Sequence, residues 1–191
     1  MKKITMNQLE LLIQFVWSEY LHQASSEDLY QSVISCNWDS NNHLLDWIMQ
    51  DQTVDQAVIL AVYWMSDPTF AKRYMHREDV LAKDSWYVNN FDFIENLEEK
   101  YIRNFWHNNE IAFNPAHDQD GVDWTMTYDK SKVLRPISEK MFIALTGKKM
   151  YRDENFQEGL TKSWNSKIWM IFDEHEIVFT EHAHQHNRSK S

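Results

Sequence analysis

Glycine and proline are scarce in this chain, which has only three of each among its 191 residues. Sandwiches and barrels of β-strands need many tight turns, and those turns rely on the special backbone angles of glycine and proline. Long helices joined by short polar links need far fewer of them. The scarcity therefore favours a mainly α fold, and the length allows one well-buried core or two small lobes that share one.

Apolar residues recur at helical spacing from residue 5 to about residue 107, so we predict that residues 1–107 form a helical bundle domain. Residues 54–65 are apolar all round, as in a helix buried at the centre of a bundle. Pro68 ends this helix, because proline disfavours helical geometry at the residue before it. Further helices are expected around residues 9–21, 29–34, 44–49, 70–74 and 91–105.

The pattern changes near residue 108. We expect residues 108–180 to form a smaller α+β C-terminal part that packs on the bundle and contains one or two β-hairpins. Residues 111–128 predict a strand, a loop and a second strand, because apolar residues flank the turn signal Asp120-Gly121.

Two more segments of this part have predictable structure. Residues 136–147 predict a short helix that stops at Gly147. Residues 167–180 allow either a hairpin or one helix, and their aromatic and β-branched content favours the hairpin. The helix would align Trp164, Ile168, Ile171 and His175. Residues 181–191 are a polar tail that we predict to be disordered.

The N-terminus superficially resembles a signal peptide, because two lysines precede an apolar stretch. Glu10 and Gln14 interrupt that stretch, and no small-residue cleavage site follows. No apolar run approaches membrane-spanning length. The single cysteine, Cys36, excludes an intramolecular disulfide and a cysteine-based zinc site, and it fits a reducing compartment. We therefore predict a cytoplasmic protein with no membrane partner.

The charge balance is acidic, with a formal net charge of −10 at pH 7. This balance argues against nucleic acid as a partner and allows a basic macromolecule. Acidic residues cluster in the middle of the chain, at Asp84, Asp92, Glu95, Glu98 and Glu99. A basic stretch follows over residues 130–152. The plainest interpretation of both stretches is two solvated faces of a soluble protein.

The stretch SCNWDSNNHLLDWIMQ, residues 35–50, combines a cysteine and a histidine just ahead of an apolar run. Cys36 would be a thiol nucleophile if His43 acted as its base. Nothing nearby supplies an oxyanion hole, and a lone cysteine is more often a small buried hydrophobic residue. The sequence therefore favours a structural role for the stretch.

An N-terminal cap explains the same stretch better. Asp39 or Ser40 can accept hydrogen bonds from the free N–H groups of the first helical turn. Trp38, just outside that cap, could pack on the apolar face that begins at Leu44, as in a hydrophobic staple. Asn37 would then satisfy backbone groups of the loop. We interpret the stretch as the start of a helix.

Metal-capable side chains are densest in residues 117–123 and 175–186. The first group is His117, Asp118, Asp120 and Asp123, and the second is His175, His182, His184 and His186 with Glu174, Glu176 and Glu181. A calcium loop aligned on Gly121 would begin at Ala116 and end at Thr127, and neither is a suitable ligand. The second group lies at the terminus, where order is least expected. We predict no metal, no cofactor and no catalytic residue.

Residues 27–74 resemble an uncharacterised bacterial family, domain of unknown function 4274. The matching positions are Asn37, Trp38, Asp39, Asp55, Ala57, Tyr63, Trp64 and Pro68. The chain departs from the family pattern at Ser40 and Asn41, where a glycine is usual, and at Val54, where a cysteine is usual. The resemblance implies a small, largely helical cytoplasmic protein. It also suggests an immunity role, because such proteins often occur beside contact-dependent or type VI toxin loci.

The leading hypothesis is a non-enzymatic immunity protein that binds a cognate toxin, expected to be basic, and occludes its active site. The acidic residues Asp84, Asp92, Glu95, Glu98 and Glu99 are the candidate contacts, because an acidic inhibitor is steered toward a basic target. We expect a monomer or a weak dimer. Two alternatives stay open: a metal-dependent hydrolase that uses the histidines and aspartates of residues 117–123 and 175–186, and a helical adaptor.

Overall fold

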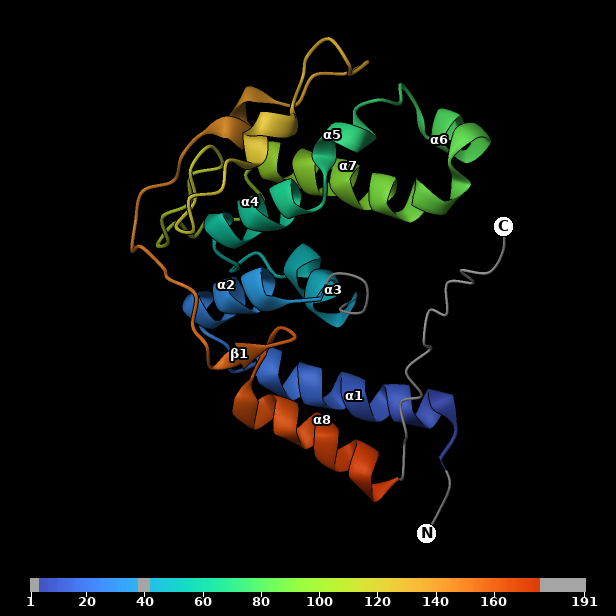
Figure 1. Cartoon of the computed structure of the whole chain (residues 1–191), viewed down its shortest axis with the longest axis vertical. Coiled ribbons are helices and arrows are strands. Elements are labelled where there is room, and N and C mark those ends of the chain that lie inside the picture. Colours follow the sequence, from blue (N-terminus) through green and yellow to red (C-terminus); the bar gives the residue numbers. More distant parts are fainter. Residues whose placement is uncertain (1–3, 38–41, 176–191) are drawn as a thin grey trace, which may run out of the picture.

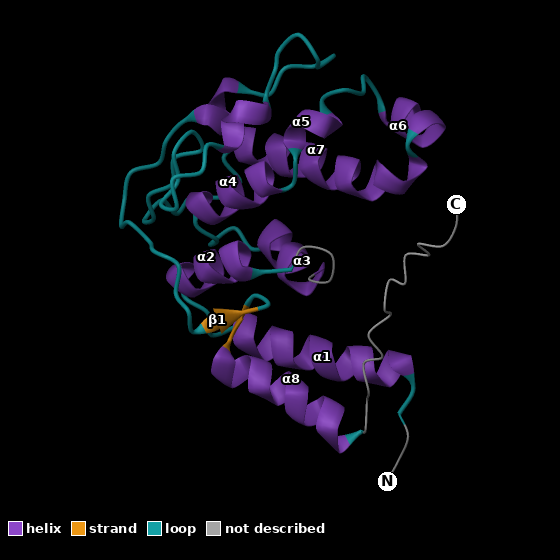
Figure 2. Cartoon of the chain, in the orientation of Figure 1, coloured by secondary structure: helices purple, strands orange, loops and turns teal. Residues whose placement is uncertain are grey.

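The computed structural model describes residues 4–37 and 42–175. Within these ranges the protein is mostly helical, with eight α-helices, three short 3₁₀ helices and one two-stranded antiparallel sheet (Figures 1 and 2). The prediction of a mainly α fold with a β-hairpin in the C-terminal part is confirmed. None of the described helices is both long and apolar enough to cross a membrane.

The first seven helices follow one another along the chain. They are α1 (Met6–Leu21), α2 (Ser26–Ser35), α3 (Asn42–Gln50), α4 (Gln56–Met65), α5 (Pro68–Ala71), α6 (Arg77–Lys83) and α7 (Val88–Ile102). The remaining elements are η1 (Ser85–Tyr87), η2 (Trp124–Thr127), η3 (Glu139–Phe142), β1 (Phe156–Gln157), β2 (Leu160–Thr161) and α8 (Lys162–Glu174).

Capping boxes start the first two helices. The Thr5 hydroxyl accepts a hydrogen bond from the backbone N–H of Gln8, whose side chain accepts one from the backbone N–H of Thr5. Ser25 and Asp28 make the same reciprocal pair at the start of α2. These pairs satisfy N–H groups that have no partner within the helix, so both starts are encoded locally.

Helix α4 forms the centre of the core. Its residues from 57 to 64 are all buried, and it packs against α2 and α7. Asp55 caps its start and is itself fully buried, with one carboxylate oxygen 2.8 Å from the backbone N of Ala57. The other oxygen accepts from the backbone N–H groups of Glu110 and Ile111, at 2.6 and 3.3 Å. A single carboxylate therefore joins the central helix to the start of the C-terminal part.

The predicted hairpin over residues 111–128 is wrong. Ile111 and Phe113 form isolated bridges with Lys148 and Leu145, and residues 124–127 are the 3₁₀ helix η2. The reason lies in the loop between them. The buried Asp118 carboxylate accepts hydrogen bonds from the backbone of residues 120 and 122 and from the indole of Trp124, and these bonds hold a compact loop in place of a strand.

The predicted helix over residues 136–147 is shorter than expected, because only the single turn η3 forms. Gly147 lies well past η3 and does not act as its stop. Its backbone packs against residue 110 so closely that an added Cβ would lie 2.3 Å from the Glu110 carbonyl oxygen. The glycine is needed for this close approach between two segments.

Residues 162–174 form helix α8, so the first strand of the hairpin favoured for residues 167–180 is wrong and that part of the segment is helical. Residues 176–180 lie outside the described residues. Helix α8 contacts α1, and the two run side by side in opposite directions (Figure 1). Trp164 packs against Tyr20 of α1, with ring centroids 5.9 Å apart. The hairpin of the C-terminal part is instead β1–β2, just before α8.

Two helices near α7 also differ from expectation. The helix predicted around residues 70–74 is the short α5, which ends at Ala71, and α6 was not predicted. Asp79 explains the start of α6, because its carboxylate accepts from the backbone N–H of His76, 3.0 Å away. The predicted long helix is α7, which ends at Ile102.

Candidate partner-binding groove

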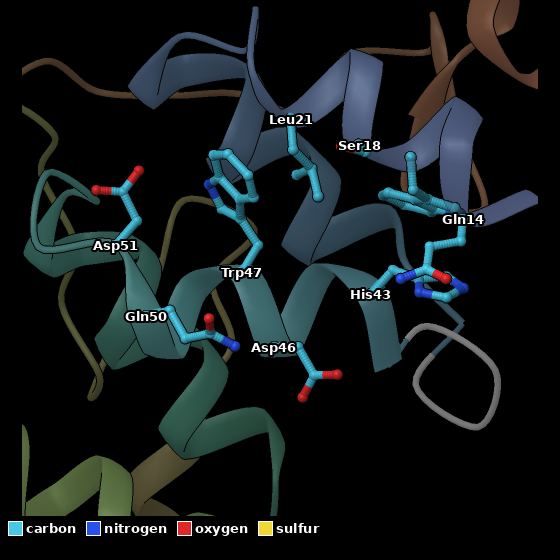
Figure 3. Close-up of a pocket in the computed structure, with 9 residues that line it drawn as sticks. Gln14, Ser18, Leu21, His43, Asp46, Trp47, Gln50 and Asp51 are labelled. Atoms are coloured by element: carbon cyan, nitrogen blue, oxygen red, sulfur yellow. The ribbon is translucent and has the colours of Figure 1, made fainter. Parts of the chain in front are cut away.

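A groove of 540 Å³ lies between α1 and α3 (Figure 3). It is lined by Gln14, Trp17, Ser18, Leu21, His43, Asp46, Trp47, Gln50 and Asp51. His43 links the two helices at one end, since its Nε2 atom lies 3.0 Å from the Glu10 carboxylate. The volume is in the range of small-molecule sites, so the groove can also hold one long side chain of another protein.

The helical period of α3 sets the polar wall of the groove. Leu44, Ile48 and Met49 are buried in the core, so the intervening residues face outward. Among them, Asp46 is exposed and Trp47 is half-buried. Figure 3 shows the Trp47 indole projecting from α3 toward α1, beside the Leu21 side chain.

The indole of Trp47 is held in place by His22, which follows the last residue of α1. Its ring packs edge-on against the His22 ring, with centroids 4.7 Å apart and an angle of 66° between the planes. Aromatic pairs of this geometry contribute about 0.5–1.5 kcal/mol beyond the area they bury. The indole is therefore a preformed wall of the groove.

The groove is anionic. Asp46 and Asp51 contribute carboxylates, and no lysine or arginine of the described chain lines it. A second groove, of 470 Å³, lies on the other side of α3, shares Asp46 and adds Asp67, again with no lysine or arginine among its described lining residues. Clefts lined by one sign of charge focus the electric field. Both sides of α3 therefore attract cations.

The acidic residues predicted as partner contacts lie elsewhere, on and around α7. Glu98 is buried, and its carboxylate contacts the Lys72 ammonium at 2.7 Å. The same carboxylate accepts hydrogen bonds from the Tyr63 hydroxyl at 2.8 Å and from the backbone N–H of Ser138 at 3.0 Å. Its polar atoms are thus turned toward the protein interior.

Glu95 continues this network. Its carboxylate lies 2.8 Å from the Lys72 ammonium and accepts two hydrogen bonds from the Arg135 guanidinium, at 2.5 and 3.0 Å. Burial raises the pKa of Glu95, but the hydrogen bonds and positive charges of Arg135 and Lys72 outweigh burial, and the pKa falls below its usual value. Glu95 is therefore held as a carboxylate by two cations of the same chain.

The other three predicted contacts also have partners within the chain. Asp84 accepts a hydrogen bond from the Tyr74 hydroxyl at 2.6 Å. The remaining two form ion pairs: Asp92 with Arg77 at 2.8 Å, and Glu99 with Arg103 at 2.7 Å. The acidic cluster of the sequence is thus largely neutralised by neighbouring groups, and its role in partner binding stays a prediction.

Residues 24–102 match a family model described as a domain of unknown function (DUF4274). That segment is a DUF4274 domain. It contains α2 to α7 and confirms the resemblance found in the sequence. A search of curated proteins and a search of solved structures each found no match.

Most motif positions of the DUF4274 domain that the structure describes are buried in its core. Tyr63 is buried and donates to Glu98, and the buried Trp64 indole donates to the Met141 carbonyl at 2.8 Å. Asn37 is exposed at the end of α2. Trp38 and Asp39, with the predicted cap and staple, lie outside the described residues.

The alternative catalytic and metal groups are only partly described. Cys36 is half-buried, and Asp118 organises the loop before η2 as described above. The second histidine group lies outside the described residues except for Glu174 and His175. Among residues 4–37 and 42–175, no three histidine, cysteine, aspartate or glutamate side chains lie close enough together to hold a metal ion.

Sequence reasoning missed the α1–α3 groove. One of its walls belongs to the DUF4274 domain and the other to α1, which lies outside the matched segment. A signal was present in α3, where Asp46, Trp47 and Gln50 fall between buried apolar positions. The pairing of α3 with α1, however, depends on the whole fold.

Proposed function

We propose that this protein is a non-enzymatic immunity protein, which binds a basic bacterial toxin delivered by contact-dependent or type VI secretion and occludes the toxin's active site. The observation that carries the proposal is the pair of anionic grooves on either side of α3, whose described lining residues include no lysine or arginine. These grooves offer negative charge that no lysine or arginine among residues 4–37 and 42–175 neutralises from within the groove lining.

The overall charge supports the same proposal. The formal net charge of −10 attracts a positively charged partner at long range, and electrostatic steering raises association rates. Toxins that attack nucleic acid carry basic residues around their substrate groove. An acidic protein that covers such a groove pairs with the residues that would hold the substrate, so binding and inhibition have the same cause.

The indole of Trp47 supplies a second ingredient of tight binding. Tryptophan, tyrosine and arginine dominate the energetics of protein interfaces. Trp47 lies in the wall of the groove between α1 and α3, where a partner can reach it. We further propose that the protein acts in the cytoplasm as a monomer or weak dimer.

The test is co-expression with the product of the neighbouring upstream gene. The C-terminal domain of the upstream gene product is expressed in susceptible cells, with and without this protein, and growth is measured. We expect growth to be restored, and we expect the two proteins to co-purify when an inactive toxin variant is used for preparation.

An unrelated acidic protein of similar size and net charge is the control, since it should neither restore growth nor co-purify. Continued killing with no complex, while this protein is soluble and folded in the same cells, would remove the proposal. Restored growth without a complex would also contradict it, because occlusion requires binding.

A further inference from the structure

We infer that the groove between α1 and α3 is the seat of an arginine or lysine side chain from the protein partner. The inference rests on the proposed function and deepens it, because it names one site and the chemical group that the site accepts. It also places the partner's contact at Asp46 and Asp51, on and just after α3, and not at the acidic residues around α7.

The charges of the groove favour a cation from outside the chain. No described lysine or arginine forms an ion pair with Asp46, which is exposed, or with Asp51, which follows the end of α3. Asp51 already accepts hydrogen bonds at one oxygen, from the backbone N–H and the hydroxyl of Thr53, both at 2.8 Å. These bonds fix the orientation of its carboxylate. A guanidinium or ammonium group in the groove would meet two carboxylates and no lysine or arginine among the described lining residues.

The indole of Trp47 gives the groove a second affinity for cations. A cationic group within about 6 Å of an indole ring is attracted by the negative face of that ring. Because His22 packs edge-on against Trp47, the indole is oriented before the partner arrives. Preorganisation of this kind lowers the entropy that binding loses.

Amide side chains complete the fit for a long cationic side chain. Gln14 from α1 and Gln50 from α3 line the groove, and both can hydrogen-bond a partner's backbone or side-chain groups. Trp47 provides half-buried apolar surface for the methylene stem of arginine or lysine, and the almost fully buried Trp17 and Leu21 lie beneath it. The groove thus offers separate surfaces for the stem and the head of one such side chain.

The network on α7 shows why that face is the weaker candidate. Its carboxylates already hold Lys72 and Arg135, and Lys72 is almost fully buried. A partner's cation would have to displace one of these side chains. The groove carboxylates make no such ion pair within the described chain.

The test uses full-length ¹⁵N-labelled protein and three capped tripeptides, Gly-Arg-Gly, Gly-Leu-Gly and Gly-Glu-Gly. The indole N–H resonance of Trp47 is assigned with the Trp47→Phe variant, and its shift is followed during each titration. We expect Gly-Arg-Gly to cause a saturable shift of this resonance and of the α1 and α3 amide resonances. We expect no saturable shift with Gly-Leu-Gly or Gly-Glu-Gly.

Two double variants with the same change in net charge sharpen the result. Asp46→Asn with Asp51→Asn removes both groove charges while preserving hydrogen-bond acceptors, and we expect binding at least about tenfold weaker. Glu78→Gln with Glu139→Gln changes exposed carboxylates that do not line the groove, and we expect unchanged binding. Equal affinity in both double variants, or shifts scattered over the whole surface, would overturn the inference.

The same double variants separate this inference from the proposed function. If the groove variant loses Gly-Arg-Gly but still co-purifies fully with the toxin domain, the groove is not the partner's seat and the immunity proposal stands. If the unaltered protein binds Gly-Arg-Gly at the groove but neither rescues nor binds the toxin domain, the immunity proposal fails. If the groove variant loses both Gly-Arg-Gly binding and toxin binding while the control variant keeps them, the result supports the groove inference and the immunity proposal.

Discussion

At the scale of single residues, Lys72 shows how this fold manages buried charge. Its side chain is 4% exposed, and its ammonium lies between the carboxylates of Glu95 and Glu98. Arg135 adds a second cation, so the four charged groups balance. Buried ion pairs lose hydration when they form, and they are favourable only when every polar group finds a partner. The hydrogen bond from Tyr63 to Glu98 meets part of that requirement.

The first residue-scale prediction concerns Lys72→Met. The substitution keeps the volume but leaves Glu98 as a buried anion without its cation, so we expect a loss of about 3 kcal/mol in the free energy of unfolding. Urea denaturation measures this loss. The matched control is Arg103→Met, which breaks the exposed ion pair with Glu99 and should cost about 0–1 kcal/mol. Similar losses in the two variants would contradict the account of the network.

The burial of Glu98 could have been predicted, but its partner could not. Glu98 falls on the face of α7 that carries Ile94 and Tyr101, because residues three and four positions apart share a face. Its cation, Lys72, is far away in sequence, immediately after α5. Helical periodicity indicates which face is buried, whereas it contains no information about the partner across the interface.

At the scale of elements, α8 shows where sequence patterns are ambiguous. Its aromatic and β-branched residues suit a strand, yet their spacing also gives one helical face. Contact with α1 decides between the two, since that face packs there. The chain reverses earlier instead, at Glu158-Gly159, where both residues have positive φ (50° and 81°). A two-residue hairpin turn with positive φ at both positions favours glycine.

The element-scale prediction concerns this turn. Gly159→Ala adds left-handed backbone strain and places a Cβ 3.0 Å from the Trp17 ring, so we expect a loss of about 2 kcal/mol in stability. Gly121→Ala has a similar φ of +79° but its nearest contact is 3.8 Å away, so we expect a loss of about 1 kcal/mol from strain alone. The urea midpoints of both variants give the comparison. A larger loss for Gly121→Ala would contradict the expected cost of the close contact between residue 159 and the Trp17 ring.

At the scale of the whole molecule, the negative net charge could be predicted from the sequence. The position of the carboxylates that are available to a partner could not. Composition gives a net charge of −10, and the sequence clusters acids near α7. The fold pairs four of those acids with Lys72, Arg77, Arg103 and Arg135, and the fifth, Asp84, accepts a hydrogen bond from Tyr74. Within the described part of the chain, Asp46 and Asp51 have no such pairs, and they line a groove that exists only because α1 packs on α3. Packing between distant elements, which no local pattern encodes, sets the candidate site.

The central claim is that the surface around α3 receives the basic partner, and hydroxyl-radical footprinting of Trp47 tests it most directly. The oxidation rate of Trp47 is measured in the free protein and with the toxin domain, and exposed Trp86 on η1 serves as the internal reference. We expect the partner to reduce oxidation of Trp47 several-fold while Trp86 keeps its rate. Protection of Trp86 with no change at Trp47 would contradict the account.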